Sequence, residues 1–417
     1  MTYNPPYYKQ VFHSSRRFFA KHWLSLQPVL QIALTGSQGK TNTANVLAKV
    51  LESVGNTIRT DLNLDTTYNV PITALKVMPW TKFAVFELGV DRERDMDIAL
   101  EIVKPKIGII TGIAPVHTDK EHLGSLENVI KEKQKLIQSL PRDGYAILNF
   151  DDEKVRAMAP HTKAHIIWYG TDKKNCDIWV DPKTVKLSLE GTSFILQGRT
   201  LHMDLQTSLI GKHHIYTIMA TYSTLESIKK LQNISYSIEQ FSEILKTIKP
   251  LPGRMSVEKG PLETMLLNDS LRANPSSTKS GLETLSEISY SKGRKIAVLA
   301  EMGELKKPEE EHKNIIDLVK KLDINYVITI GNLYPESPDI LHTKNVHEAA
   351  ETLKKMVKKD DLVYLKGSLL RHIERVRYLL EGRRVGCLVT LCPFYIHCSD
   401  CRYLTRGYVP SSIGSGN

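Results

Sequence analysis

A loop that could hold phosphate, Gly36-Ser37-Gln38-Gly39-Lys40-Thr41, follows the apolar run QIALT and precedes the helical pattern NTANVLAKVLE. Glycines let backbone N–H groups converge on an anion at a helix N-terminus, a lysine adds positive charge, and a threonine hydroxyl can bind Mg²⁺. A strict G-x-x-x-x-G-K-[ST] loop would have glycine at position 34, which is leucine. We therefore predict nucleotide binding by a shortened phosphate loop. The alternative is a chance match in an ordinary strand, turn and helix.

The loop belongs to a regular alternation of apolar runs and helical patterns between about residues 31 and 152. The apolar runs are QIALTG, FAVFELG, KIGIITGI and YAILNFD, and the segments between them include SLENVIKEKQKLIQSLP. This alternation predicts a parallel sheet covered by helices. Between residues 165 and 210 the shorter stretches VKLSLEG, TSFILQG and LHMDLQTSLI predict antiparallel hairpins with glycine at the turns.

The last third repeats the alternation in the runs KIAVLAEMG, YVITIG and DLVYLKGS. The fold class that we predict is α/β, with a central P-loop-type parallel sheet domain, a β-hairpin subregion and a smaller C-terminal Rossmann-like domain. The expected domains are a short helical N-terminal extension (1–30), a nucleotide-binding domain (31–249), a second α/β domain (250–382) and a cysteine-containing tail (383–417).

Charge and composition narrow the range of partners. The formal net charge is +10, but Lys and Arg are interspersed with Glu and Asp and form no single basic block. We therefore expect small anionic substrates and no nucleic acid. No apolar run is long enough to span a bilayer, and the basic start has no clean apolar signal core, so we expect a cytoplasmic protein.

The tail holds four of the five cysteines, Cys387, Cys392, Cys398 and Cys401, in a C-x4-C-x5-C-x2-C spacing. Four thiolates could bind Zn²⁺ tetrahedrally, although only the last pair has a common ligand spacing. Free or loosely exposed thiols are the alternative. The body has only Cys176, so disulfides do not hold it together.

Between about residues 31 and 381 the sequence resembles the Mur ligase family. The motifs that carry the resemblance are LTGSQGKTNTANVL, FAVFELGVDRERDM, GYAILNFDD, LPGRMSV, NDSLRANPSS, VLAEMGEL and LVYLKGS. The resemblance implies an ADP-forming carbon–nitrogen ligase that uses ATP and Mg²⁺. Such an enzyme activates a carboxylate as an acyl phosphate, which an amine then captures. The implied substrates are cell-wall precursors, to which an amino acid or a D-Ala-D-Ala-like dipeptide is added.

The resemblance also implies roles for residues of the first domain. Lys40 matches the phosphate-binding lysine, and Thr41 matches a magnesium ligand. Glu87 and His117 match further metal-binding residues. Lys133 aligns with a lysine that the family carbamylates to make an anionic metal ligand, whereas the alternative is an exposed lysine on a helix.

The resemblance also implies roles for five residues of the second domain. Arg254 matches an arginine that reaches the nucleotide phosphates, and Asp269 matches a residue that contacts the ribose or orders the region. Asn274, Lys366 and Ser368 are expected near the substrates. Each of these residues could instead be structural.

The sequence departs from the family at its start, where about thirty residues are too few for the domain that binds the UDP-sugar in wall-synthesis members. Two other functions therefore stay open. One is the same chemistry on a folyl- or poly-glutamate-like acid, and the other is a non-catalytic ATP-binding subunit.

Overall fold

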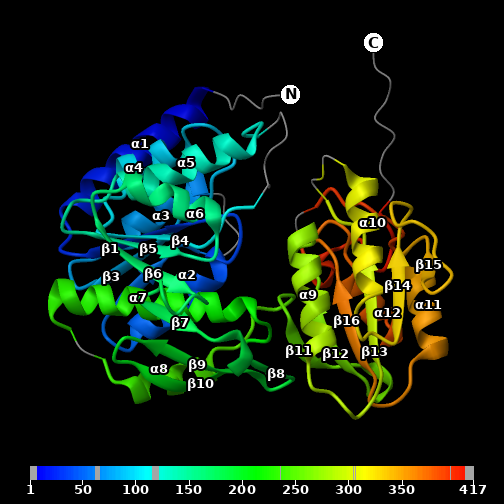
Figure 1. Cartoon of the computed structure of the whole chain (residues 1–417). Helices are drawn as coiled ribbons and strands as arrows, with labels where there is room; N and C mark the ends of the chain where they lie inside the picture. Colours follow the sequence, from blue (N-terminus) through cyan, green and yellow to red (C-terminus); the bar gives the residue numbers. More distant parts are fainter. Residues whose placement is uncertain are drawn as a thin grey trace. The chain divides into compact units, whose positions relative to one another are not determined.

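The computed structural model describes residues 7–61, 66–114, 122–234, 236–303, 305, 307–394 and 396–408. The chain divides into two compact units, shown in Figure 1. The first comprises residues 1–186, 192–207 and 213–248, and the second comprises residues 187–191, 208–212 and 249–417. The α/β fold class predicted from the sequence is confirmed in both units.

The first unit is built on a ten-stranded sheet with the order β10-β9-β7-β6-β5-β4-β1-β3-β2, and β8 pairs with β9 off this path. Its strands are β1 (Leu30–Thr35), β2 (Thr57–Arg59), β3 (Phe83–Glu87), β4 (Ile107–Ile110), β5 (Tyr145–Asn149), β6 (His165–Gly170), β7 (Ile178–Val180), β8 (Lys186–Ser188), β9 (Gly191–Gly198) and β10 (His202–Thr207). Strands β2 to β7 and β1 pair in parallel, whereas β9 is antiparallel to both β7 and β10. The predicted hairpin region therefore extends the parallel sheet.

Helices cover both faces of this sheet. They are α1 (Tyr7–Ser25), α2 (Lys40–Glu52), α3 (Thr66–Lys76), α4 (Asp95–Ile102), α5 (Leu126–Gln138), α6 (Glu153–Met158), α7 (His213–Gln232) and α8 (Ile238–Thr247), with the short 3-10 helices η1 (Ala159–His161) and η2 (Pro182–Thr184). Helices α2, α7 and α8 pack together on one face, and α3 to α6 cover the other (Figure 1). Because both faces are covered, the central strands are apolar throughout, as β4 (IGII) shows.

Helix α1 packs on α3 and α4. Ala20 and Leu24 have no exposed area, and the indole N–H of Trp23 donates to the carbonyl oxygen of Val77 over 2.7 Å. The opposite side carries exposed aromatic side chains, among them Phe18. None of the helices in the described ranges is both long and apolar enough to cross a membrane.

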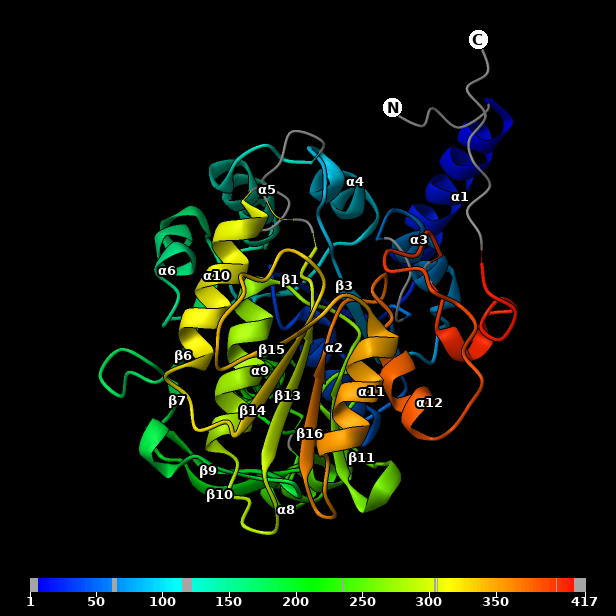
Figure 2. The same ribbon diagram turned by 90° about the vertical axis from the view of Figure 1, so that its right-hand side faces the viewer.

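The second unit is built on a six-stranded sheet with the order β11-β12-β16-β13-β14-β15. Its elements are β11 (Ser256–Lys259), η3 (Pro261–Glu263), β12 (Met265–Asp269), α9 (Pro275–Glu287), β13 (Lys295–Ala300), α10 (Pro308–Val319), β14 (Tyr326–Ile330), β15 (Leu341–Thr343), α11 (Val346–Met356), β16 (Leu362–Lys366), α12 (Glu374–Leu380) and η4 (Cys398–Asp400). All neighbouring strands are parallel except β11 and β12. Helices α9 and α10 pack on one side of the sheet and α11 and α12 on the other (Figure 2).

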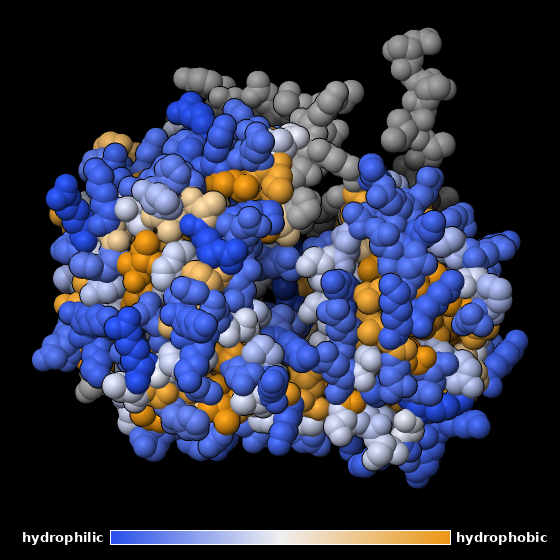
Figure 3. Space-filling view, in the orientation of Figure 1, coloured by the Kyte–Doolittle hydropathy of each residue, from blue (hydrophilic) through white to orange (hydrophobic). Residues whose placement is uncertain are grey.

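The tail folds back on the second unit. The backbone N–H of Gly386 donates to the carbonyl oxygen of Leu404 over 2.8 Å, which closes a loop. The guanidinium of Arg375, which is 1% exposed, donates to the carbonyl oxygens of Cys387 over 2.9 Å and Val389 over 2.6 Å. Hydrophilic side chains cover most of the visible face of each unit (Figure 3).

Candidate active site

The loop after β1 requires glycine at two positions. A Cβ on Gly36 would lie 2.0 Å from the side-chain oxygen of Thr111, so a larger residue fits only if Thr111 or the loop moves. Gly39 has a φ of 77°, a left-handed conformation that glycine adopts at little cost, and it is the N-cap residue of α2. The two glycines therefore allow a tight turn directly before the helix.

Two sources of positive charge lie at the loop, the N-terminal end of α2 and the side chain of Lys40. Helix α2 starts at Lys40, and the Lys40 ammonium group donates to the carbonyl oxygen of Gly36 over 2.7 Å, so its side chain folds back over the loop. The backbone N–H of Ser37 donates to Gly112, and its hydroxyl donates to Ala114 over 3.1 Å. The chain that follows β4 thus fixes the loop in a form suited to an anion.

Thr41 and Glu87 bring two hard oxygen donors together. The hydroxyl of Thr41 donates to the carboxylate of Glu87 over 2.9 Å. Glu87 ends β3, which pairs in parallel with β1, and Leu34 is its register partner. The carboxyl ends of the two strands therefore lie at the same edge of the sheet. A carboxylate beside a hydroxyl is a donor set that fits Mg²⁺.

Lys133 is 2% exposed on α5, so the alternative of an exposed helix lysine is wrong. Burial, together with the positive charge of Lys40, lowers the pKa of Lys133 to about 7, although Asp91 and Asp95 act in the opposite direction. Lys133 therefore has a substantial neutral fraction at neutral pH. Its sequence neighbours Lys131 and Lys135 gave no sign of this difference, because the helix register alone decides which lysine is buried.

His117, the remaining predicted metal-binding residue, lies outside the described residues. Its predicted role stays a prediction.

A second polar cluster lies at the carboxyl edge of the sheet in the second unit. The ammonium group of Lys366, whose side chain is 2% exposed, donates to the carboxylate of Asp269 over 2.7 Å. The hydroxyl of Tyr364 donates to the same oxygen over 3.0 Å. Asp269 and Lys366 are register partners at the ends of β12 and β16. Sequence reasoning missed Tyr364, although its position two residues before Lys366 places both side chains on one face of the strand.

The other predicted residues of the second unit have local structural contacts. Asn274 caps α9, because its side-chain oxygen accepts from the backbone N–H of Ser277 over 2.8 Å. Arg254 closes a turn by donating its backbone N–H to Leu251 over 2.9 Å. The carbonyl oxygen of Ser368 accepts the backbone N–H of Arg371 over 3.0 Å. The substrate and nucleotide roles expected for Asn274, Arg254 and Ser368 stay predictions.

An ion pair that sequence reasoning did not single out lies close to this edge. The Arg371 guanidinium contacts the Glu301 carboxylate at 2.8 Å, with side chains 18% and 12% exposed respectively. Glu301 is the residue after β13 within the AEMGEL motif, so its place at a strand end was the available signal.

The structure does not support a zinc site made of the four tail cysteines. All five cysteines of the chain are free, and three of the four tail thiols, Cys387, Cys392 and Cys398, are buried and not loosely exposed. Among the described residues, one group of three side chains has possible metal-binding atoms that all lie within 4.8 Å of one another. The group is His372, Glu374 and Cys398. Spacing along the sequence could not show that His372, which precedes α12, and Glu374, its first residue, lie beside Cys398.

Comparison with known proteins extends the sequence resemblance. The Mur ligase middle domain matches residues 34–225, and the Mur ligase glutamate ligase domain matches residues 253–369. The UDP-N-acetylmuramoyl-tripeptide–D-alanyl-D-alanine ligase of Escherichia coli (strain K12) is 28% identical over 312 residues, which cover 74% of this chain and 66% of that protein. The chain spans 58% to 66% of the length of the first curated relatives that it matches.

Two solved structures share the fold. MurF from Acinetobacter baumannii superposes with a TM-score of 0.79 at 20% identity, covering 89% of this chain and 81% of that one. The MurF ligase from Thermotoga maritima in complex with ADP superposes with a TM-score of 0.77 at 21% identity, covering 89% and 83% of the two chains.

Proposed function

The chain belongs to the Mur ligase family through its middle and glutamate ligase domains, and we propose that it is an ADP-forming carbon–nitrogen ligase. The proposed reaction adds D-alanyl-D-alanine, or a similar dipeptide or amino acid, to the carboxylate of a peptidoglycan precursor such as UDP-N-acetylmuramoyl-tripeptide. Because the reaction consumes ATP, we place it in the cytoplasm.

The proposed reaction has two steps. A carboxylate oxygen of the acceptor acid attacks the γ-phosphorus of ATP, the bond to ADP breaks, and an acyl phosphate forms. The amine nitrogen then attacks the acyl carbon, phosphate leaves, and the amine loses a proton. In both steps the protein neutralises the charge on the phosphates and aligns the reacting groups, and it forms no covalent bond with them. Lys40 and the N–H groups of residues 38–41 would bind the phosphates, and the family resemblance gives Arg254 the role of a further, planar donor to them.

Mg²⁺ would be held by Thr41 and Glu87, with His117 and Lys133 as further ligands. When bound, it supplies neutralisation of the phosphate charge. The 2.9 Å contact between Thr41 and Glu87 supports this assignment, because two oxygen ligands of one Mg²⁺ lie about 3 Å apart.

Lys133 would bind the metal as a carbamate. A neutral lysine amine can add to CO₂ with loss of a proton, which converts a buried cation into an anion. Burial and Lys40 lower the pKa of Lys133 to about 7, so the neutral amine needed for this step is available near neutral pH. Asp269, Lys366, Ser368 and Asn274 would orient substrates in the second unit.

The observation that carries the proposal is the combination of the glycine loop with the Thr41–Glu87 pair at the end of two adjacent parallel strands. The test is a screen for phosphate release with ATP, Mg²⁺, D-alanyl-D-alanine and UDP-N-acetylmuramoyl-tripeptide. We expect release only when both substrates are present, and we expect Lys40→Ala to abolish it.

The same screen separates the alternatives. Turnover only with a folate- or glutamate-type acid would keep the ligase chemistry and change the substrate. Binding of ATP without turnover on any acid and amine would support a non-catalytic subunit. Full activity of Lys40→Ala would show that the phosphate site is assigned wrongly.

A further inference from the structure

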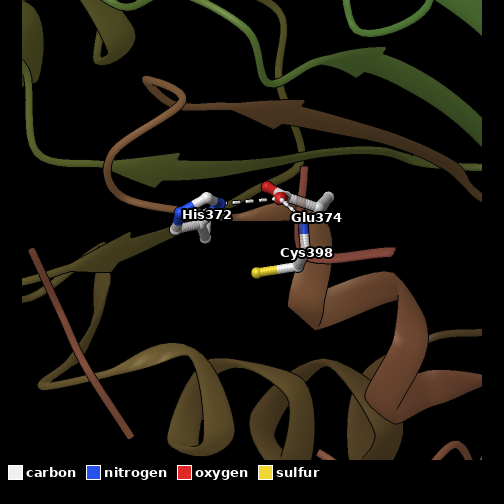
Figure 4. Close-up of side chains that lie close together, drawn as sticks. All are labelled: His372, Glu374 and Cys398. Atoms are coloured by element: carbon white, nitrogen blue, oxygen red, sulfur yellow. Dashed lines mark hydrogen bonds and ion pairs between the residues drawn. The ribbon is translucent and has the colours of Figure 1, made fainter. Parts of the chain in front are cut away.

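Three side chains with different donor atoms, none of them a predicted ligase residue, meet inside the second unit. Figure 4 shows His372 and Glu374 at the start of α12 with the thiol of Cys398 beside them. The imidazole nitrogen, carboxylate oxygen and sulfur all lie within 4.8 Å of one another. The three residues are 2%, 7% and 5% exposed respectively, so water does not compete freely for these donors.

Backbone hydrogen bonds hold Cys398 beside His372 and Glu374. Its backbone N–H donates to the carboxylate of Glu374 over 3.4 Å. The tail segment before it is held by the two carbonyl contacts of Arg375 and by the Gly386–Leu404 hydrogen bond. These contacts therefore hold the tail on both sides of Cys398 against the second unit.

The charges around the group suit a bound cation with anionic ligands. Nδ1 of His372 lies 2.9 Å from the Glu374 carboxylate, and Nε2 of His372 is buried without a hydrogen-bond partner. The Glu374 carboxylate and the Cys398 thiol, which loses its proton when it binds a metal, would bring two negative charges to a divalent cation.

We propose that His372, Glu374 and Cys398 bind one Zn²⁺ ion. A tetrahedral zinc ion with bonds of about 2.0–2.3 Å holds its donors roughly 3.3–3.8 Å apart, so the present arrangement needs only small side-chain shifts. A nitrogen, oxygen and sulfur set favours zinc over Mg²⁺ and Ca²⁺, which prefer oxygen ligands alone. Three protein donors leave the fourth position to water.

The ion would fix the tail to the turn that follows the KGS motif. The backbone N–H of His372 donates to the carbonyl oxygen of Ser368 over 3.3 Å, so a ligand at His372 restrains the turn that carries Ser368. This role is structural and does not depend on the proposed ligase activity.

The test uses the full chain without a histidine tag. Protein loaded with Zn²⁺ and dialysed against metal-free buffer is expected to retain about one equivalent by elemental analysis. Replacement with Co²⁺ is expected to give the intense near-ultraviolet band of sulfur-to-cobalt charge transfer and the visible bands of a tetrahedral ion. Glu374→Gln should weaken Co²⁺ binding by at least about 10-fold, and Cys398→Ser should also remove the charge-transfer band.

Matched variants give the controls. Cys176→Ser removes a buried thiol of the first unit and should leave metal content unchanged. Cys387→Ser and Cys392→Ser remove neighbouring tail thiols and should also retain the metal. The proposal is overturned if the wild-type protein retains no zinc, if its cobalt form lacks a sulfur band, or if Cys387→Ser and Cys392→Ser lose metal as completely as Cys398→Ser. If Cys398→Ser fails to fold, the presence or absence of the sulfur-to-cobalt band in the wild-type protein still shows whether a thiolate binds the metal.

Discussion

The Thr41 hydroxyl donates to the Glu87 carboxylate over 2.9 Å and so joins the first turn of α2 to the end of β3. If both groups hold one Mg²⁺, Thr41→Val and Glu87→Gln should each reduce phosphate release by about 100-fold, within the range for loss of one electrostatic contact in a transition state. The double variant should be little worse than either single one, because both act through the same ion.

The measurement for this prediction is phosphate release as a function of Mg²⁺ concentration. Thr43→Val, a change of the same type at a buried position of α2, is the control and should retain activity. Multiplicative losses in the double variant would mean that the two side chains act independently.

Gly36→Ala should abolish nucleotide binding. The added methyl would lie 2.0 Å from the Thr111 side-chain oxygen, which donates to the carbonyl oxygen of Gln38, so either the loop or the Thr111 contact that holds it must shift. Titration calorimetry with ADP measures the effect. Gly112→Ala is the matched control, since its Cβ would meet its nearest neighbour, the Asp152 carboxylate, at an ordinary 3.5 Å. Wild-type affinity in Gly36→Ala would contradict the assigned loop.

Lys133→Met should make the unmodified protein more stable while it abolishes turnover. The pKa of Lys133 falls from 10.5 to about 7 on folding, and each pKa unit corresponds to about 1.4 kcal/mol, so charge burial costs a few kcal/mol. The unfolded state binds more protons between these two values, so the stability of the wild-type protein rises with pH across this range. The advantage of Lys133→Met is therefore full below about pH 7 and disappears toward pH 10.5.

Urea unfolding in bicarbonate-free buffer at several pH values measures this difference. Lys131→Met, on the exposed side of the same helix, should change stability little at any pH. An advantage of Lys133→Met that grows with pH would contradict the prediction.

Asp269→Asn should destabilise the second unit by about 3–5 kcal/mol, because the buried Lys366 ammonium would lose its anionic partner. Asp269→Asn combined with Lys366→Met should recover much of this loss, since the unpaired charge is then gone. Glu243→Gln, which breaks the exposed pair with Lys246, should cost less than about 1 kcal/mol. Equal losses in the single and double variants would argue against a charge effect.

Leu24→Ala should cost about 2–5 kcal/mol, because Leu24 is fully buried where α1 packs on the first unit. Phe18→Ala, on the exposed side of α1, should change the free energy of unfolding by about 0.5 kcal/mol or less. Thermal unfolding of the two variants measures the difference. Similar midpoints would mean that α1 does not contribute to the folded core.

The sequence predicted the fold class and the phosphate loop because both depend on local patterns. Alternation of apolar runs and helical patterns identifies a covered parallel sheet, and glycines before Lys40 mark the turn. The proximity of Thr41 to Glu87 follows only from the strand order, in which β3 lies beside β1 although β2 comes between them in sequence. The resemblance to a known family, not the spacing, supplied that pairing.

Other features could not be read from sequence because they depend on register and on distant contacts. The burial of Lys133, between the exposed Lys131 and the partly buried Lys135, is set by which side of α5 faces the sheet. The capping role of Asn274 competes with the substrate role expected from its motif. The approach of Cys398 to His372 and Glu374 depends on contacts between distant parts of the second unit and has no local signature.

The burial of Arg375 has a consequence for synthesis of the chain on the ribosome. Two of its four carbonyl partners belong to Cys387 and Val389, so the guanidinium is fully paired only after these residues have left the exit tunnel. Domains generally fold as units during translation, beginning with the N-terminal one. The first unit can thus complete its core while the nascent polypeptide is still growing, whereas the second must wait for the last residues that cover α12.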